Sequence, residues 1–343
     1  MGELILFALI KIVVILFGYV MAFATVLTWL ERKYSALLQD RIGPNRAEVG
    51  GMRLGGLFHM IADPIKVLFK EDFFPSDANP ILYKLAPWMS VVPPMMLFAV
   101  IPFGPGDMFV ISDASIGVLF LFAMGGLGVY GSVFGGWASN SKYSLLGGLR
   151  TTAQMISYEV AMGLNLVGIF MIYEAITLQG IIGEQGGTVL GFIPAWGIFL
   201  QPVSFFLFMA SAMAENKRAP FDLPEAESEL VAGYFTEYSS MKFALFSLGE
   251  FIEIVAIGCI TTCLFLGGWQ IPWVEPTGGF LLVTLQVLTF LAKVAFMVWV
   301  QMTIRWTLPR FRYDQIMKLG WVYILPLSLI NILATGVVLY ILA

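Results

Sequence analysis

Residues 321–342, WVYILPLSLINILATGVVLYIL, form an uncharged run that is long enough to cross a lipid bilayer as one helix. A hydrocarbon core about 30 Å thick needs about 20 apolar residues in an α-helix. Similar runs recur along the chain, which is 59% hydrophobic with a mean hydropathy of +0.84. Eight spans are predicted, at residues 4–30, 85–103, 115–137, 152–173, 192–213, 243–266, 280–303 and 321–342.

These spans predict the fold class, an all-α polytopic membrane protein that forms one transmembrane domain over residues 1–343. Only 12% of the residues are charged, whereas a soluble domain has about 25%. Lipid offers the backbone no hydrogen-bond partners, so a chain crosses it only as helices or as a closed barrel. The apolar runs are much longer than the strands of roughly ten residues that build a barrel. Lys11 inside the first run also argues against a signal peptide.

The cations predict the orientation of the bundle. Seventeen of the 19 Lys and Arg residues lie in four connections, 31–84, 138–151, 214–242 and 304–320. None lies in the alternate connections, 104–114, 174–191 and 267–279. The positive-inside rule makes the first four the inner loops, on the cytoplasmic or matrix side, and leaves both termini outside.

The first inner loop contains a predicted amphipathic helix at 53–70, RLGGLFHMIADPIKVLFK. We expect Pro64 to kink or interrupt it. Such a helix either covers the end of the bundle or forms the lip of an opening for a lipid-soluble molecule. Upstream, a Gly43-Pro44-Asn45 turn separates two basic segments, which suit either anionic lipid or an acidic partner.

A segment at 215–237, ENKRAPFDLPEAESELVAGYFTE, concentrates charge between two apolar spans. Mutual repulsion raises the pKa of some of these carboxyl groups towards neutrality unless Lys217 and Arg218 neutralise them. Groups that titrate near pH 7 suit a proton relay, and the alternative is a solvated acidic loop. The carboxylates of the segment are Glu215, Asp222, Glu225, Glu227, Glu229 and Glu237.

Five ionisable residues are predicted to lie inside the spans: Glu159, Glu250, Glu253, Lys11 and Lys293. Such groups are costly at membrane depth and generally face the bundle interior or a wet cavity. Together with the acidic segment they indicate a polar path from the inner loops into the bundle. A structural ion pair, such as Lys293 with Glu253, is the competing interpretation.

The remaining motifs argue against a redox or nucleotide site in this chain. Cys259 and Cys263 are interpreted as small buried residues, and His59 is the single histidine, so ligands for haem, an iron–sulfur cluster or another metal are missing. No GxGxxG or P-loop opens a βαβ unit. The last inner loop, RWTLPRFRYDQ at 305–315, sets arginines among aromatic residues, which favours docking of a partner or of phospholipid.

Four segments resemble the quinone-site membrane subunit of respiratory complex I, known as subunit 1 in mitochondria and as the H subunit in bacteria. They are ERKYSALLQDRIGPNR (31–46), RTTAQMISYEV (150–160), AENKRAPFDLPEAESELVAGYFTEY (214–238) and RWTLPRFRYDQ (305–315). The resemblance extends over essentially the whole chain, and the acidic segment is its most specific part.

The resemblance implies a membrane subunit of a proton-translocating NADH:quinone oxidoreductase with no catalytic residue or redox centre of its own. It would form the quinone entrance and tunnel with peripheral-arm subunits and contact small membrane subunits, antiporter-like subunits and phospholipid, but no nucleic acid. Ubiquinone or menaquinone would be the substrate, and FMN and iron–sulfur clusters would belong to partner subunits. The expected location is the bacterial inner membrane, with the mitochondrial inner membrane as the alternative.

The resemblance also assigns residues. The implied proton path consists of Asp63, Glu159, Glu215, Asp222, Glu225, Glu227, Glu229 and Glu250. The implied quinone chamber consists of Tyr158, Arg32, Arg41, Arg46, Arg150, Arg218, Arg305 and Arg310. Glu253 matches no position of that pattern and receives no role. Competing functions are a membrane anchor of an energy-converting hydrogenase, a stand-alone cation transporter and a passive scaffold.

Overall fold

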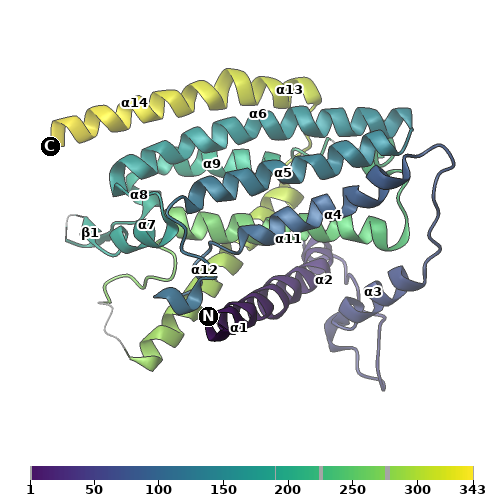
Figure 1. Ribbon diagram of the computed structural model, residues 1–343, viewed down its shortest axis with the longest axis horizontal. Helices are drawn as coiled ribbons and strands as arrows, with labels where there is room; N and C mark the ends of the chain where they lie inside the picture. Colours follow the sequence, from purple (N-terminus) through teal and green to yellow (C-terminus); the bar gives the residue numbers. More distant parts are fainter. Residues whose placement is uncertain (1, 190, 224–226, 275–278, 343) are drawn as a thin grey trace.

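The chain is built mainly of helices in the computed structural model, which describes residues 2–189, 191–223, 227–274 and 279–342 (Figure 1). The first half contains α1 (Gly2–Val13), the π-helix η1 (Val14–Met21), α2 (Ala22–Leu38), the 3-10 helix η2 (Leu54–Gly56), α3 (His59–Phe69), α4 (Pro80–Leu97), the 3-10 helix η3 (Asp107–Phe109), α5 (Gly117–Ala138) and α6 (Lys142–Tyr173). The second half contains α7 (Leu178–Glu184), β1 (Thr188–Val189), β2 (Ile193–Pro194), α8 (Gly197–Leu200), α9 (Pro202–Glu215), α10 (Glu227–Leu230), the 3-10 helix η4 (Gly233–Phe235), α11 (Ser240–Phe265), α12 (Phe280–Thr307), α13 (Tyr313–Lys318), the π-helix η5 (Leu319–Ile324) and α14 (Leu325–Leu342).

The centre of the molecule is a row of helices in the order α6, α5, α4 and α11 (Figure 1). Helices α9 and α14 pack against α6, and α12 and α2 pack against α11. Glycines of α5 allow the close approach: a Cβ added at Gly131 would lie 2.1 Å from Ser90 Oγ of α4, and one at Gly136 would lie 2.5 Å from the Ser144 carbonyl of α6. Small residues are the usual means of tight helix packing in membranes, where helices gain little hydrophobic stabilisation from meeting each other.

Six described helices have the length and apolar composition to cross a membrane: Leu6–Leu38, Gly117–Ala138, Lys142–Tyr173, Ser240–Phe265, Phe280–Thr307 and Tyr313–Leu342. The all-helical membrane class is therefore supported, apart from the two-residue strands β1 and β2, which pair antiparallel. Helix α9 is apolar but shorter, and α4, with three internal prolines, is not among the six. The count of eight and the sides of the termini stay predictions.

Several helices begin, end or break at other residues than the predicted spans, and two of them show why. Helix α6 begins at Lys142, ten residues before the predicted boundary at 152. A Cβ at Gly147 would lie 2.7 Å from Gly233 Cα, so tertiary packing holds a first stretch of helix that hydropathy does not indicate. The predicted span at 192–213 is broken at Gln201, whose φ of −133° and ψ of 59° separate α8 from α9.

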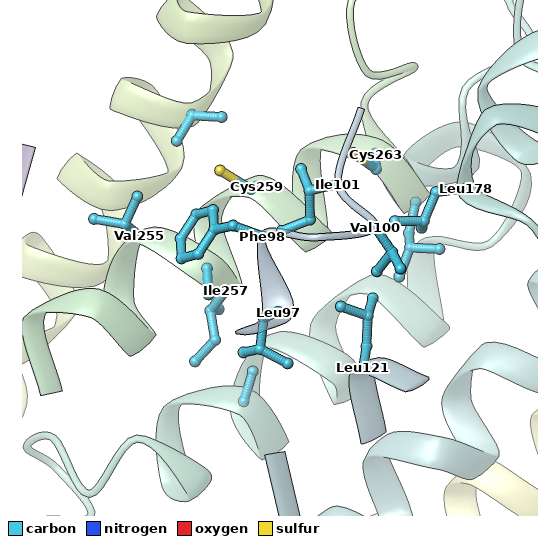
Figure 2. Close-up of a cluster of buried hydrophobic side chains, with 14 of the residues drawn as sticks. Leu97, Phe98, Val100, Ile101, Leu121, Leu178, Val255, Ile257, Cys259 and Cys263 are labelled. Atoms are coloured by element: carbon cyan, nitrogen blue, oxygen red, sulfur yellow. The ribbon is translucent and has the colours of Figure 1, made fainter. Parts of the chain in front are cut away.

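The largest hydrophobic core lies where the central helices meet the segment after α4 (Figure 2). Phe98 and Ile101 are fully buried there, as is Val255 of α11. Cys259 and Cys263 lie in the same core as free, fully buried thiols, as predicted for small buried residues.

Helix α3 lies apart from the central row and contacts α2 and α11 (Figure 1). It confirms the predicted helix but begins at His59, and it continues through Pro64 without the expected interruption. A proline removes one backbone hydrogen bond, but its fixed φ suits a helix. No residue of α3 is buried, and Ile61, Leu68 and Phe69 are 62%, 60% and 88% exposed.

The two lysines inside predicted spans bind backbone carbonyls. Lys293 Nζ donates to the carbonyls of Leu266, Gly268 and Gln270 at 2.7, 3.0 and 2.7 Å, just beyond the end of α11. Lys11 donates to the carbonyls of Asp107 and Val110, the latter at 2.9 Å. Among the described ion pairs, none joins Lys293 to Glu253, so that example of a structural ion pair was wrong, although Glu250 pairs with Arg218.

Candidate functional site

A buried charge cluster joins α2, the turn after α9, α11 and the end of α12. Arg218 Nη1 donates to both carboxylate oxygens of Glu31, at 2.9 and 3.1 Å, and Arg305 forms an ion pair with the same carboxylate. Arg218 Nη2 lies 3.7 Å from Glu250 Oε2. The side chains of Glu31, Arg218 and Glu250 are only 9%, 9% and 12% exposed. Paired charges of this kind persist in a low-dielectric interior because each one compensates the other.

The turn after α9 is held in place by the amide of Gln154 on α6. Its Nε2 donates to the carbonyls of Ala214 and Phe221, at 2.7 and 2.9 Å, so it spans the turn that carries Arg218. On the other side, the backbone N–H of Phe311 donates to the Pro220 carbonyl at 3.0 Å. One buried side chain and one backbone bond thereby fix the turn against α6 and the last predicted inner loop.

Asp222 extends the cluster towards that loop. Arg310 Nη2 donates to Asp222 Oδ2 at 2.8 Å, and the Asp222 side chain is 14% exposed. Burial raises the pKa of Asp222 to about 6, because desolvation and the nearby Glu250 outweigh the opposing effects of Arg310 and Arg218. Asp222 therefore titrates closer to neutral pH than an ordinary aspartate.

Three more carboxylates lie along one stretch of α5, each from a different helix. Glu215, at the end of α9, has its Oε1 3.1 Å from the position of a Cβ on Gly125. Glu159 of α6 lies 2.9 Å from such a Cβ on Gly126, and Glu253 of α11 lies 3.5 Å from one on Gly128. Glycines at these positions leave room for the carboxylates between the helices.

Lys217 and Tyr234 lie between the two groups of charges. Lys217 Nζ is 3.4 Å from Ser132 Oγ and 5.4 Å from the centre of the Tyr234 ring. The Tyr234 hydroxyl donates to Glu250 Oε1 at 3.4 Å. Asp222 interacts electrostatically with Glu250 and Arg218, and Lys217 interacts with Glu215 and Glu253, so the two groups of charges are neighbours.

Two cavities accompany these groups. One of about 60 Å³ is lined by Glu215, Asn216 and Glu253, with otherwise apolar walls. The other, of about 20 Å³, is lined by Glu31, Arg218, Arg305 and Asn216 among others. Asn216 contributes to both, so the charge cluster and the carboxylates at α5 border neighbouring spaces.

Other predicted site residues lie outside this cluster. Arg150 Nη1 donates to Glu229 Oε2 at 2.6 Å, and Asp63 pairs with Arg32 and, at 3.6 Å, with Lys66. Tyr158 is fully buried, and its hydroxyl donates to the Ile316 carbonyl at 2.9 Å, which ties α6 to α13. Arg41 donates to Gln39 and Ser35, and Arg46 is exposed. Glu225 lies outside the described residues, and for Glu227 only the backbone, in α10, is described.

The prediction missed Glu31, which binds two arginines, and Asn216, which borders both cavities. Glu31 directly follows the first apolar run and precedes Arg32, so its position at a span end was a usable signal. No local pattern marks Asn216, because its role depends on the cavities on either side of it.

Comparison with known proteins gives consistent results. A family model described as NADH dehydrogenase matches residues 10–336. An NADH-quinone oxidoreductase H-type subunit, numbered 2, of Rhizobium meliloti (strain 1021) is 45% identical, with 91% of each chain covered. The H-type subunit numbered 1 of Geobacter sulfurreducens is 44% identical, with 95% of this chain and 93% of the relative covered. The H-type subunit numbered 1 of Geobacter metallireducens is 46% identical, with 95% of each chain covered.

Proposed function

Since this chain belongs to the NADH dehydrogenase family, among the H-type membrane subunits of NADH-quinone oxidoreductase, we propose that it forms the quinone entrance and couples quinone reduction to proton translocation. Its partners would be the peripheral-arm, small membrane and antiporter-like subunits of the complex. FMN and the iron–sulfur clusters would belong to partner subunits and not to this chain. The substrate would be ubiquinone or menaquinone.

One observation carries the coupling role: the buried ionisable groups follow one another from Asp222 to the carboxylates at α5. Asp222 and its partner Arg310 lie nearest the last predicted inner loop, and the Glu31–Arg218–Glu250 cluster lies next. Glu215 follows, at the border of the cavity of about 60 Å³. Groups that exchange protons at short spacing or through single waters constitute a relay. Glu159 would extend the path along α5.

The proposed quinone entrance lies beside α3. Its exposed apolar residues, including Ile61 and Leu68, suit contact with lipid or with an isoprenoid tail. The contacts of α3 with α2 and α11 put this surface next to the helices that carry Glu31 and Glu250. A molecule that entered there would approach the buried arginines, which suit the polar head of a quinone.

The coupling role is tested by Glu159→Gln in the assembled complex, in membrane vesicles that contain a pH-sensitive dye. We expect proton uptake driven by NADH and quinone to fall, because glutamine keeps the shape of the side chain but neither releases nor takes up a proton near neutral pH. Electron transfer from NADH to an artificial acceptor should stay unchanged. The matched control is Glu184→Gln, since Glu184 is an exposed carboxylate of α7.

The outcomes separate the competing functions. Loss of both activities would indicate failed assembly, which the subunit composition of the purified complex would reveal. Unchanged proton uptake, with Glu229→Gln also unchanged, would refute the coupling role and favour a passive scaffold. Cation transport by the chain alone in liposomes would favour a transporter.

A further inference from the structure

We propose that Glu253 is a proton-carrying residue that exchanges its proton with Glu215 through water in the cavity of about 60 Å³, an inference that rests on the proposed function. Glu253 lies on α11 and Glu215 at the end of α9, and their side chains border the same space. Nothing in the family pattern assigned a role to Glu253.

The walls of the cavity favour water at a few positions. Its polar lining residues are Glu215, Asn216 and Glu253, and the others are apolar. Three of the apolar ones, Leu97, Leu121 and Ile257, belong to the hydrophobic cluster drawn in Figure 2. To hold one water, a cavity needs about 10–15 Å³ of space that the centre of a water molecule can occupy, and the water needs two to four polar partners. The cavity of about 60 Å³ exceeds that volume and supplies three polar side chains.

Two of the residues that line the cavity each carry a buried polar atom with no hydrogen-bond partner among the described residues. Glu253 Oε2 and Asn216 Oδ1 accept no hydrogen bond from the protein, and Asn216 is only 1% exposed. A buried polar atom without a hydrogen bond costs roughly 1–3 kcal/mol, so cavity waters that donate to these atoms would stabilise the site. This pair of atoms is the observation that points to water as the ligand.

The surrounding charges suit a single mobile proton. Lys217, Arg218 and Glu250 interact electrostatically with Glu253, and Glu159, Glu253 and Lys217 interact with Glu215. Two carboxylates that share an apolar cavity repel each other when both are charged, which favours one proton held between them.

The transfer itself needs no further reactant. The O–H bond of protonated Glu253 breaks as its proton passes to a cavity water, and that water gives one of its own protons to the Glu215 carboxylate. The negative charge thereby moves from Glu215 to Glu253, and the water is regenerated. Asn216, which also borders the cavity at Glu31 and Arg218, orients the water and connects this exchange to the charge cluster.

The test uses Glu253→Gln in the assembled complex, with Glu253→Asp and Glu184→Gln as companions. We expect the glutamine variant to lose a protonated-carboxyl band in the redox-induced infrared difference spectrum, and the band to shift in D₂O in the wild-type protein. We also expect its coupled proton uptake to fall about tenfold or more, since a positioned acid–base group contributes roughly 10²–10⁴-fold. The aspartate variant should keep a shifted band and part of the uptake, and Glu184→Gln should resemble the wild-type protein.

Several results would overturn the inference. An unchanged infrared spectrum in Glu253→Gln would mean that Glu253 exchanges no proton. Normal proton uptake in Glu253→Gln, with Glu159→Gln defective, would refute the role of Glu253 while the proposed function stands. Normal uptake in both variants and in Glu229→Gln would refute the proposed function as well. If Glu253→Gln does not assemble, the same bands are sought in Glu253→Asp, and an unshifted carboxyl spectrum there also refutes the role.

Discussion

Replacing Glu31 by glutamine tests the charge cluster most directly. The Glu31 carboxylate holds both Arg218 and Arg305, so the substitution leaves two guanidinium groups without their shared anion. Removing one member of a buried ion pair costs about 3–5 kcal/mol, because the remaining charge stays desolvated. Folding stability should therefore depend on Glu31 far more than on an exposed carboxylate.

The structure favours the lower end of that range. Arg218 keeps Glu250 at 3.7 Å, and the Arg305 side chain is 24% exposed, so water compensates part of its charge. We expect a loss of about 3 kcal/mol in the free energy of unfolding, which is roughly a hundredfold in the ratio of folded to unfolded protein. The control Glu48→Gln removes a surface pair with Arg53 whose side chains are 48% and 61% exposed, and we expect about 0–1 kcal/mol.

The free energy of unfolding is measured by equilibrium unfolding of the purified chain in mixed detergent micelles. The midpoint temperature of thermal unfolding of the assembled complex ranks the same variants independently. The double variant Glu31→Gln with Arg305→Gln should cost less than the sum of the single variants, since both sides of one ion pair are then removed. The reasoning is refuted if Glu31→Gln costs no more than Glu48→Gln, or if the two substitutions are strictly additive.

Two further predictions concern titration and packing. The pKa of Asp222 is about 6 in the folded chain, against about 3.9 when unfolded. Protonation of Asp222 therefore adds its full contribution to the free energy of unfolding below about pH 4, and this contribution is lost as the pH rises through about 6. Asp222→Asn should therefore flatten the pH dependence of the unfolding free energy between about pH 4 and 6, and an unchanged slope would contradict the assignment. Gly147→Ala should destabilise by about 1–3 kcal/mol or more, because its Cβ would lie 2.7 Å from Gly233 backbone atoms. Gly163→Ala in the same helix meets nothing within 4 Å and should be neutral or stabilising, so equal thermal midpoints for the two variants would refute the packing account.

Some helix boundaries were beyond the reach of hydropathy. The start of α6 at Lys142 depends on glycine contacts with α5 and with Gly233, whereas the local sequence there contains two cations and little apolar periodicity. Likewise, the partners of Lys293 are carbonyls at the end of α11, which become visible only once α12 is packed beside it.

The candidate site was predictable as a set of residue types but not as a geometry. The acidic segment and the intramembrane carboxylates stood out by their charge in an apolar chain. The pairing of Arg150 with Glu229 and of Arg310 with Asp222 did not follow from that pattern. The segment's central carboxylates, Glu225 and the Glu227 side chain, lie outside the described residues, and their role stays a prediction.

The sequence by itself determined that this chain is a helical membrane protein with charge gathered at a few places, because hydropathy is a sum over neighbouring residues and needs no knowledge of the fold. Only the tertiary structure decided which charges meet. Glu31 and Arg218 are 187 positions apart in the chain, yet the packing of α2 and α9 on α11 makes them one ion pair. Electrostatic partners depend on distance through space and on exclusion of water, and both arise only when the helices come together.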